Sequence, residues 1–388
     1  MSVLRRSLPA RGSLQLIRHL GAAITAALLI GACSYSADGD TEVAALPAAS
    51  DAAPTWWFDA PCDPAAADCV PPLPADPPTA TVELPDGHTE LLELTDADAI
   101  VVGAPGATIG SIEVSASGVR IVGVDVEVIV VNPNADRTTI ESSRIGQLFV
   151  NGADGVLVRG NLIRPYDLGP DAVQIKTFDG DTPENLLFEA NVIGPQDSDG
   201  EAHTDCVQIL GGDQIRFARN VVLPCGDKAF QIRSGAGGVV GHVALEGNVI
   251  YECPEQRVGC EGFHAIVWAS TDTSVLELVH NTIRGSVGVS SGGSTVDPGD
   301  NLIASGNIAA SLPCTEATVE NLTVSHEPCG AGSVQSDFPA FVDDAATVGD
   351  LRLVDPTAVP VASEPFGPSI WSSSTCAAPR FGAAIACS

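Results

Sequence analysis

The chain has 388 residues, of which 49 are Asp or Glu and 18 are Lys or Arg, so its net charge at neutral pH is −31. A chain this acidic argues against nucleic acid as a partner, because the nucleic acid backbone is itself negative. An anionic polysaccharide is also disfavoured unless a local group of cations or a bound divalent cation offsets the field.

Residues 1–32 have the pattern of an export signal and are left out of the fold. Four arginines accompany an apolar run from Leu20 to Ile30, which is too short to be a permanent membrane span. The run ends in Leu-Ile-Gly-Ala-Cys, which resembles the signal of bacterial lipoproteins. This resemblance implies that Cys33 is lipidated, and that the protein is exported and held at the bacterial cell envelope by lipid alone. The alternative is an ordinary secretory signal with a coincidental cysteine.

Ten cysteines remain once Cys33 is set aside, an even number in a chain expected to be exported. None of them has the Cys-x-x-Cys spacing of a zinc site, and they fall into close neighbours along the chain. We therefore expect short-loop disulfides. The pairs are Cys62 with Cys69, Cys206 with Cys225, Cys253 with Cys260, Cys314 with Cys329, and Cys376 with Cys387.

Residues 33–80 are predicted to be a flexible tether, because they are rich in Ala, Pro and Asp and lack a sustained periodicity. Within them, Trp56-Trp57-Phe58 is apolar and is expected to dock on the first coil of the folded domain. From position 81 onward the sequence becomes strand-like, and we expect one folded domain over residues 81–336.

Five asparagines recur through the middle of the chain at intervals of 30, 29, 28 and 33 residues. Each is followed two residues later by Ile or Val and preceded by apolar residues three and five positions back. Short alternating strands at this period are typical of a β-solenoid, in which each period forms one coil. We expect these asparagines to stack as a structural ladder at one turn, with Val124 and Ser143 in the same place on two shorter coils. They are Asn161, Asn191, Asn220, Asn248 and Asn281.

A second motif occurs once in each long coil, as DAVQIK, DCVQIL, KAFQIR and HAIVWA, which begin at positions 171, 205, 228 and 264. Strand alternation predicts an outward column of glutamines and a leading edge of polar residues. The column contains Gln174, Gln208 and Gln231; the leading edge contains Asp171, Asp205, Lys228 and His264; Lys176 and Arg233 project from the same face.

The Asn-x-Ile/Val coils over residues 100–310 resemble the right-handed parallel β-helix of the pectate-lyase superfamily. The run DFPAFVDDAATVGDLRLVDP is similar to a tail found on bacterial secreted members. The resemblance implies an all-β, single-domain chain: a right-handed parallel β-helix (β-solenoid) over 81–336, with residues 337–388 as a C-terminal cap. Open solenoid ends expose strand edges, which also favours such a cap.

Three short motifs resemble those of polygalacturonase-type hydrolases, which carry Asn-Thr-Asp, Gly-Asp-Asp and Gly-His-Gly on successive coils. Here the counterparts are HTD at position 203, GDK at position 226 and GFH at position 262. By position, the resemblance makes Asp205, Asp227 and His264 catalytic candidates. Lys228 stands where the family has a third carboxylate, which places a standard inverting hydrolysis in doubt because that reaction needs a pair of carboxyl groups.

Lys228 instead suits a lyase, in which a basic residue removes the proton beside a uronate carboxylate, often with Ca²⁺ neutralising the sugar acid. A lysine can have its pKa lowered toward neutrality, whereas an arginine cannot. Lys176 and Lys228 are the only lysines in the chain, and with Arg233 they are predicted to form a cationic group. Lys228 or Arg233 is then the base. The structural alternative is that Lys228 neutralises neighbouring carboxylates.

The leading prediction is therefore a monomer that binds a polysaccharide and cleaves a uronate polymer by β-elimination; a non-catalytic adhesion β-helix and a hydrolase are the alternatives. Lys176, Gln174, Gln208, Gln231 and His203 are candidate substrate-binding residues. The glutamine column can equally be a structural ladder. The acidic loops 179–184 and 197–201 are either solvated turns or Ca²⁺ ligands.

Overall fold

The computed structural model describes residues 66, 69–84, 86–165, 171–196, 204–235, 237–253, 264–291, 301–315, 318–319, 321–323 and 333–335. These residues form 26 strands and no α-helix. No helix in this part of the chain has the length and apolarity that a membrane crossing requires. The predicted signal at 1–32, the lipidation site Cys33, the Trp56-Trp57-Phe58 segment and the cap at 337–388 lie outside the described residues.

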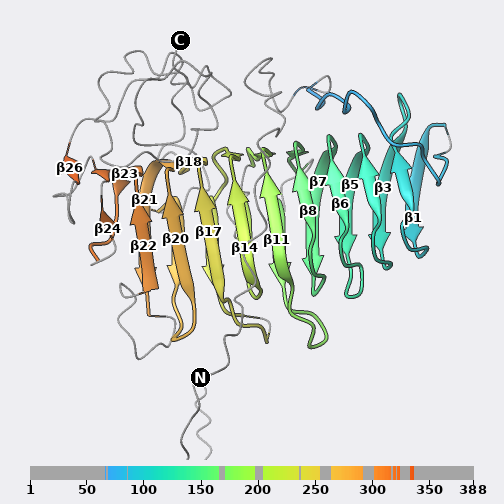
Figure 1. Ribbon diagram of the computed structural model, residues 1–388. Helices are drawn as coiled ribbons and strands as arrows, with labels where there is room; N and C mark the ends of the chain where they lie inside the picture. Colours follow the sequence, from blue (N-terminus) through green and yellow to red (C-terminus); the bar gives the residue numbers. More distant parts are fainter. Residues whose placement is uncertain are drawn as a thin grey trace, which may run out of the picture. The chain divides into compact units, whose positions relative to one another are not determined.

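Successive strands stack in two parallel sheets, so the chain winds as a parallel β-helix (Figure 1). This confirms the predicted all-β solenoid. One sheet contains β2 (Ile100–Val102), β4 (Arg120–Val122), β6 (Thr139–Glu141), β8 (Leu157–Arg159), β11 (Glu184–Glu189), β14 (Asp213–Ala218), β17 (His242–Glu246), β20 (Val275–Val279), β22 (Leu302–Ser305) and β24 (Thr318–Val319).

The second sheet has sixteen strands and divides in the middle of the stack. It begins with β1 (His88–Leu94), β3 (Thr108–Val114), β5 (Asp125–Val131) and β7 (Arg144–Asn151). One branch contains β9 (Leu162–Ile163), β12 (Val192–Ile193), β15 (Val221–Val222) and β18 (Val249–Tyr251); the other contains β10 (Val173–Lys176), β13 (Val207–Ile209), β16 (Phe230–Arg233) and β19 (Ile266–Ala269). The sheet continues through β21 (Thr282–Ser290), β23 (Ile308–Ser311), β25 (Leu322–Thr323) and β26 (Val334–Gln335).

The division of this sheet explains why the period lengthens after position 161. Strand β7 pairs through its first half with β9 and through its second half with β10, and β21 pairs with both β18 and β19. One long strand per coil thus becomes two short strands with a connection between them. The connections run from β9 to β10, from β12 to β13, from β15 to β16 and from β18 to β19, and the candidate site lies where they re-enter the sheet.

The core is built from the inward positions that strand alternation predicts. Val158, Phe188, Phe217, Leu245 and Leu278 occupy one register position on successive coils, and each is fully buried. The Phe188 and Phe217 rings stack with centroids 4.4 Å apart. Fully burying such side chains contributes about 1.5–3 kcal/mol each, so this apolar column is a main source of stability.

The predicted asparagine ladder is present, and it is longer than predicted. The main-chain N–H and the Nδ2 of each asparagine both donate to the Oδ1 of the next, and Nδ2 also donates to a carbonyl of the preceding coil, at 2.7–3.0 Å. It continues through Asn307 and Asn321 and ends on the Ser333 hydroxyl, while the Ser143 N–H donates to Asn161 at its start. The residue before each asparagine from Asn161 to Asn307 has φ between 53° and 67°, the left-handed turn conformation.

The disulfide prediction is confirmed for Cys206 and Cys225, whose Cα atoms lie 5.4 Å apart. Cys69, Cys253 and Cys314 are also disulfide-bonded. Their predicted partners Cys62, Cys260 and Cys329 lie outside the described residues, as do Cys376 and Cys387. These four pairings stay predictions.

Candidate functional site

The candidate site starts from the register of strands β10, β13, β16 and β19. Val173, Val207, Phe230 and Ile266 pair across these strands, so the residues two positions earlier also lie on neighbouring coils. Backbone hydrogen bonds from Ala172 to Asp205 and from Cys206 to Lys228 extend the same register. The result is one column at the point where the connections re-enter the sheet: Asp171, Asp205, Lys228 and His264.

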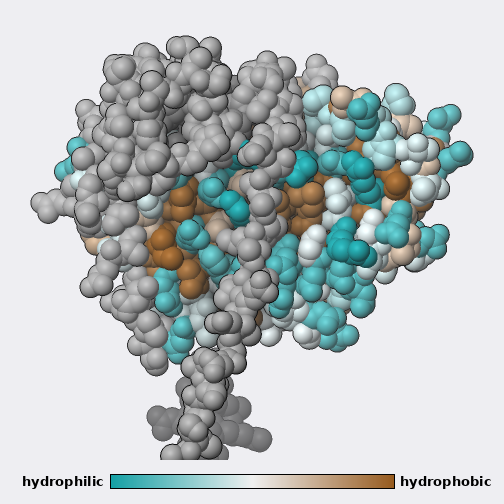
Figure 2. Space-filling view, viewed as in Figure 1, coloured by the Kyte–Doolittle hydropathy of each residue, from teal (hydrophilic) through white to brown (hydrophobic). Residues whose placement is uncertain are grey.

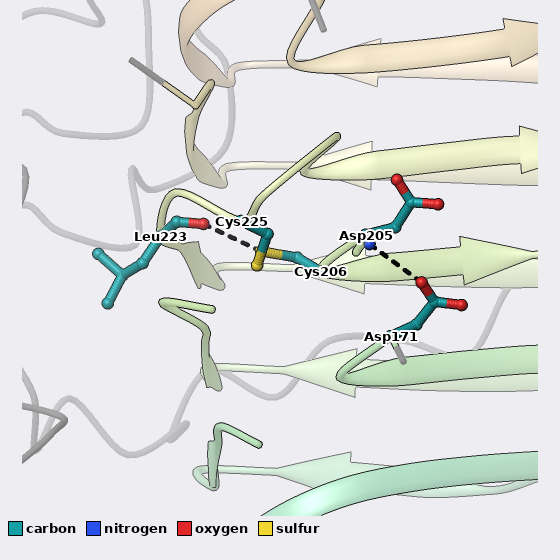
Figure 3. Close-up of a disulfide and its surroundings, with 5 residues drawn as sticks. All are labelled: Asp171, Asp205, Cys206, Leu223 and Cys225. Carbon is teal, nitrogen blue, oxygen red and sulfur yellow. Dashed lines mark hydrogen bonds between the residues drawn. A yellow bond between two sulfur atoms is a disulfide. The ribbon is translucent and has the colours of Figure 1, made fainter. Parts of the chain in front are cut away.

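Asp205 is the most perturbed group in this column. Its side chain is fully buried, and its main-chain N–H donates to Oδ1 of Asp171 at 3.0 Å (Figure 3). Oδ2 accepts a hydrogen bond of 3.3 Å from Gln208, while Oδ1 is buried without a hydrogen-bond partner. Burial, together with the carboxylates of Asp171 and Asp227, raises the pKa of Asp205 to about 7. A carboxyl group in this state is protonated for part of the time at neutral pH.

Asp227 and Lys228 form an ion pair beside Asp205, and both side chains are largely buried. The main-chain N–H of Asp227 donates to the carbonyl of Thr204, which ties the two connections together. The Cys206–Cys225 disulfide joins the same two connections, with Cys206 directly after Asp205 (Figure 3). Three carboxyl groups and one ammonium therefore share a small volume, because Asp171 also faces Asp205.

His264 ends the column on the next coil. Its Nδ1 lies 2.7 Å from the hydroxyl of Ser286, and its ring lies against Gly288, where a β-carbon would come within 2.6–2.9 Å of ring atoms. Burial and the nearby Lys228 ammonium lower the pKa of His264, so its imidazole is neutral at neutral pH. A neutral imidazole held by a hydroxyl can accept a proton.

The glutamine column lies beside the acidic residues, and each glutamine in it donates a hydrogen bond to the glutamine on the next coil. Nε2 of Gln174 donates to Gln208, and Nε2 of Gln208 donates to Gln231, both at 3.0 Å. The first two amides also donate to the aspartate three residues earlier, at 3.3–3.4 Å. This bonding pattern is what the structural interpretation of the column predicts.

Lys176 and Arg233 lie apart from the charged column. Each ends its strand, five residues after the leading-edge position, and Leu210 occupies the corresponding place on the coil between them. Arg233 is exposed and Lys176 is half-buried, whereas Lys228 is surrounded by carboxylates. The predicted cationic group is thus distributed over both ends of the strands. His203 and the 197–201 loop lie outside the described residues.

Within the described ranges, no group of three or more His, Cys, Asp or Glu side chains has the geometry to hold a metal ion. Glu184, the last residue of the 179–184 loop, lies close to carboxylates of the neighbouring coils. Burial and the charges of Asp154 and Asp213 raise the pKa of Glu184. The described carboxylates, taken together, do not fit a Ca²⁺ site.

Three residues of this site were not among the predicted site residues. Asp171 occupies the position of Asp205 in the repeated motif, so the motif could have identified it as a candidate site residue. Ser286 and Gly288 come from the coil after His264, where the motif has already disappeared from the sequence. No pattern in the sequence identifies them.

This arrangement can transfer protons in two ways. A partly protonated Asp205 beside the ion-paired Asp227 can act as an acid with a carboxylate partner, and the neutral His264 beside the Lys228 cation can act as a base. Both pairs lie where the connections re-enter successive strands of the sheet. Comparisons of the chain with family models, with curated proteins and with solved structures found no match to any of them.

Proposed function

We propose that this parallel β-helix binds a polysaccharide across β10, β13, β16 and β19 and hydrolyses its glycosidic bonds at the Asp205 group. The observation that carries the proposal is the placement of Asp205, which is fully buried next to Asp171 and next to the ion pair of Asp227 with Lys228. Burial and these neighbouring carboxylates raise the pKa of Asp205 to about 7. Glycoside hydrolysis needs one carboxyl group that is protonated and a second that is ionised. In enzymes, neighbouring carboxyl groups whose environments give them different pKa values typically act as an acid and its ionised partner.

In this mechanism Asp205 donates its proton to the glycosidic oxygen as the bond from that oxygen to the anomeric carbon breaks. Asp227 accepts a proton from a water molecule, whose oxygen forms the new bond to the anomeric carbon. Lys228 is ion-paired with Asp227, and Gln208 orients Asp205 by donating a hydrogen bond to Oδ2. Asp171 supplies the third carboxylate that the sequence motifs lacked, from the preceding coil.

The burial of the acidic residues limits access of the substrate to them. Asp205 has no exposed surface, and Asp171 and Asp227 are 5% and 6% exposed. Exposure increases along the strands toward Gln174, Gln231, Lys176 and Arg233. We therefore place substrate binding on these outer residues, and the acidic group must open for the reaction to proceed.

β-Elimination on a uronate polymer is the second candidate, and the state of His264 favours it. The neutral imidazole is suited to remove the proton beside a uronate carboxylate, and the Lys228 ammonium to neutralise that carboxylate. Lys228 is less suited to be the base, because its ammonium is already engaged in the ion pair with Asp227. Arg233 is exposed and distant along the strand from Lys228.

The test is an assay of the purified mature protein on polygalacturonate, alginate and neutral polysaccharides, with and without Ca²⁺. Hydrolysis produces reducing ends without ultraviolet absorbance, and Asp205→Asn or Asp227→Asn should lower its rate about a hundred- to ten-thousand-fold. β-Elimination produces unsaturated ends that absorb in the ultraviolet and that His264→Gln or Lys228→Ala removes. Arg137→Gln, an exposed arginine on another turn, is the matched control. Binding without either product would support the non-catalytic adhesion alternative and contradict both reactions.

The membership in the pectate-lyase superfamily and the lipid anchor belong to the same proposal. The parallel coils, the asparagine ladder and the local motif likeness support the first, and the Leu-Ile-Gly-Ala-Cys signal supports the second. Radiolabelled fatty acid should enter the wild-type protein in a bacterial host and be absent from Cys33→Ser. Incorporation that survives this substitution would contradict the anchor at Cys33.

A further inference from the structure

Two cations at the ends of strands β10 and β16 lie in one outward column with an apolar residue between them. Lys176 ends β10, Arg233 ends β16, and Leu210 follows β13 on the coil between them. Gln174 and Gln231 precede the two cations by two residues, so strand alternation directs both cations to the face of the glutamine column. Neighbouring strands are about 4.8 Å apart, which places the two cations about 10 Å apart along the solenoid.

Neither cation neutralises a carboxylate of the protein. On the other sheet, whose face shows polar and apolar side chains mixed at the surface (Figure 2), Arg159 and Arg216 are each ion-paired with a glutamate. Within the described ranges, Lys176 and Arg233 form no ion pair, although the chain has a net charge of −31. Arg233 is exposed and Lys176 is half-buried, so both can be reached from solvent. This column is therefore a place where an anionic group is attracted.

Two tight turns follow these strand ends and lead into β11 and β17, at the lower edge of the solenoid in Figure 1. In the first turn, the main chains of Phe178 and Asp181 exchange two hydrogen bonds, of 2.9 and 3.0 Å. The two residues between them have φ angles of 53° and 94°, as in a type I′ turn. The second turn is closed by a hydrogen bond of 2.8 Å from the N–H of Gly238 to the carbonyl of Gly235.

The two turns pack against each other over the short coil between them. A β-carbon on Gly211 would come within 2.6 Å of the Thr177 hydroxyl and 3.1 Å of the Gly238 Cα, so the backbone there is in contact with both turns. The turns form a continuous rim that presents Phe178 and Val239, which are 47% and 54% exposed. A sugar ring combines an apolar C–H face with polar groups at its edge, so exposed apolar side chains beside cations suit an acidic sugar.

We propose that this column and its rim bind an acidic polysaccharide in which a sugar with a carboxylate alternates with a neutral sugar. One sugar unit of an extended chain is about as long as one strand spacing, so three successive sugars face Lys176, Leu210 and Arg233. The two cations bind the carboxylates of the first and third sugars, and Leu210 faces the neutral sugar between them. Phe178 and Val239 pack against the apolar faces of the rings.

A polymer with a carboxylate on every sugar matches this column less well. Its middle carboxylate gains no cation, because Leu210 occupies that coil, and the net charge of −31 repels it. A neutral polymer leaves both cations without an anionic partner. The proposal rests on the polysaccharide binding proposed above, and it makes no use of the chemistry at Asp205.

Calorimetric titration with polysaccharides of known structure tests this site. The purified protein carries Asp205→Asn, so that the proposed hydrolysis is blocked during the measurement. Hyaluronan and unsulfated chondroitin alternate an acidic sugar with a neutral one, polygalacturonate has a carboxylate on every sugar, and dextran has none. We expect the two alternating polymers to bind at least about tenfold more tightly than polygalacturonate, and dextran not to bind.

Surface substitutions locate the binding site. Lys176→Gln and Arg233→Gln should each weaken binding of the alternating polymers at least about tenfold, because each removes a charge-assisted hydrogen bond to a carboxylate. Phe178→Ala should also weaken it, whereas Arg137→Gln, at an exposed arginine on another turn, should leave it unchanged. The proposal is overturned if neither alternating polymer binds more tightly than polygalacturonate, or if neither cation substitution weakens their binding. The expected preference in a wild-type protein that forms no product would support this site and contradict the proposed hydrolysis.

Discussion

Asn220 donates two hydrogen bonds to a single oxygen of Asn248, from its main-chain N–H at 2.8 Å and from Nδ2 at 3.0 Å. It accepts the equivalent pair from Asn191 and donates a further bond to the carbonyl of Phe188. Each asparagine is therefore both the donor for one coil and the acceptor for another. Removing one side chain leaves unsatisfied groups on two neighbouring coils.

We predict that Asn220→Ala lowers the free energy of unfolding by about 3–5 kcal/mol. The two donors of Asn191 lose their acceptor, the Phe188 carbonyl loses a donor, and a buried polar group without a partner costs about 1–3 kcal/mol. Urea unfolding followed by circular dichroism gives the difference.

Asn301→Ala is the matched control for the ladder. Asn301 makes only a long bond of 3.4 Å to the Thr271 carbonyl and has no place in the ladder, so its loss should change stability by less than about 1 kcal/mol. Equal effects of the two substitutions would mean that the ladder is not an independent source of stability.

The Cys206–Cys225 disulfide should contribute both stability and function. The bonded cysteines are 19 residues apart, and closing a loop of this size stabilises a protein by about 3 kcal/mol. The double variant Cys206→Ser, Cys225→Ser is therefore expected to unfold at a lower temperature in a calorimetric scan. Because this bond fixes the connections that carry Asp205 and Asp227, we also expect a lower rate of product formation. A variant with a lower melting temperature and unchanged rate below it would contradict the second expectation.

The sequence predicts the coil architecture well, because the ladder asparagines and the inward apolar residues repeat at fixed offsets. Asn161 and Asn191 show this directly: the same local pattern produces the same turn, and the turn sets the register. The division of the sixteen-stranded sheet is less visible, since it appears only as a longer period. A longer period has the same appearance whether the added residues extend strands or form connections.

The candidate site is predictable only in part, because its properties arise between coils. Asp205 could be chosen from its motif, but its burial and its proximity to Asp171 come from residues far away in the chain. The separation of Lys228 from Lys176 follows from their offset within the strand. Lys176 is the last residue of β10, whereas Lys228 lies two residues before β16 begins, so the register of these strands keeps the two lysines apart.

Gly288 provides a test of His264 that leaves the imidazole in place. Gly288→Ala puts a methyl group within 2.6–2.9 Å of the His264 ring, so the ring must move away from its position beside Ser286. If His264 acts as the base of β-elimination, the rate of formation of ultraviolet-absorbing product should fall at least about tenfold, while far-ultraviolet circular dichroism stays the same. Gly235→Ala is the control, because its nearest neighbour, Leu210, lies at an ordinary contact distance of 3.4 Å. Unchanged product formation in Gly288→Ala would remove His264 from the mechanism.

The raised pKa of Asp205 predicts that this residue destabilises the folded protein at neutral and alkaline pH. Its pKa is about 7 in the folded state and 3.8 for an ordinary aspartate, so the folded state binds the proton more tightly than the unfolded state. The stabilisation linked to this proton is fully present below pH 3.8 and is lost as the pH rises toward and through 7. Asp205→Asn keeps the shape of the side chain and removes the titration. We expect the variant to gain stability relative to the wild type between pH 4 and pH 8, by on the order of 4 kcal/mol at the upper end.

Asp227→Asn is the control that should change stability in the opposite direction. It breaks the ion pair with Lys228 and should therefore destabilise the protein at neutral pH. Urea unfolding of the three proteins across this pH range measures both effects. A residue whose replacement increases stability while it abolishes product formation has the behaviour expected of an active-site group. A constant difference between Asp205→Asn and the wild type at all pH values would show that Asp205 is already ionised in the folded protein, and would remove it as the acid.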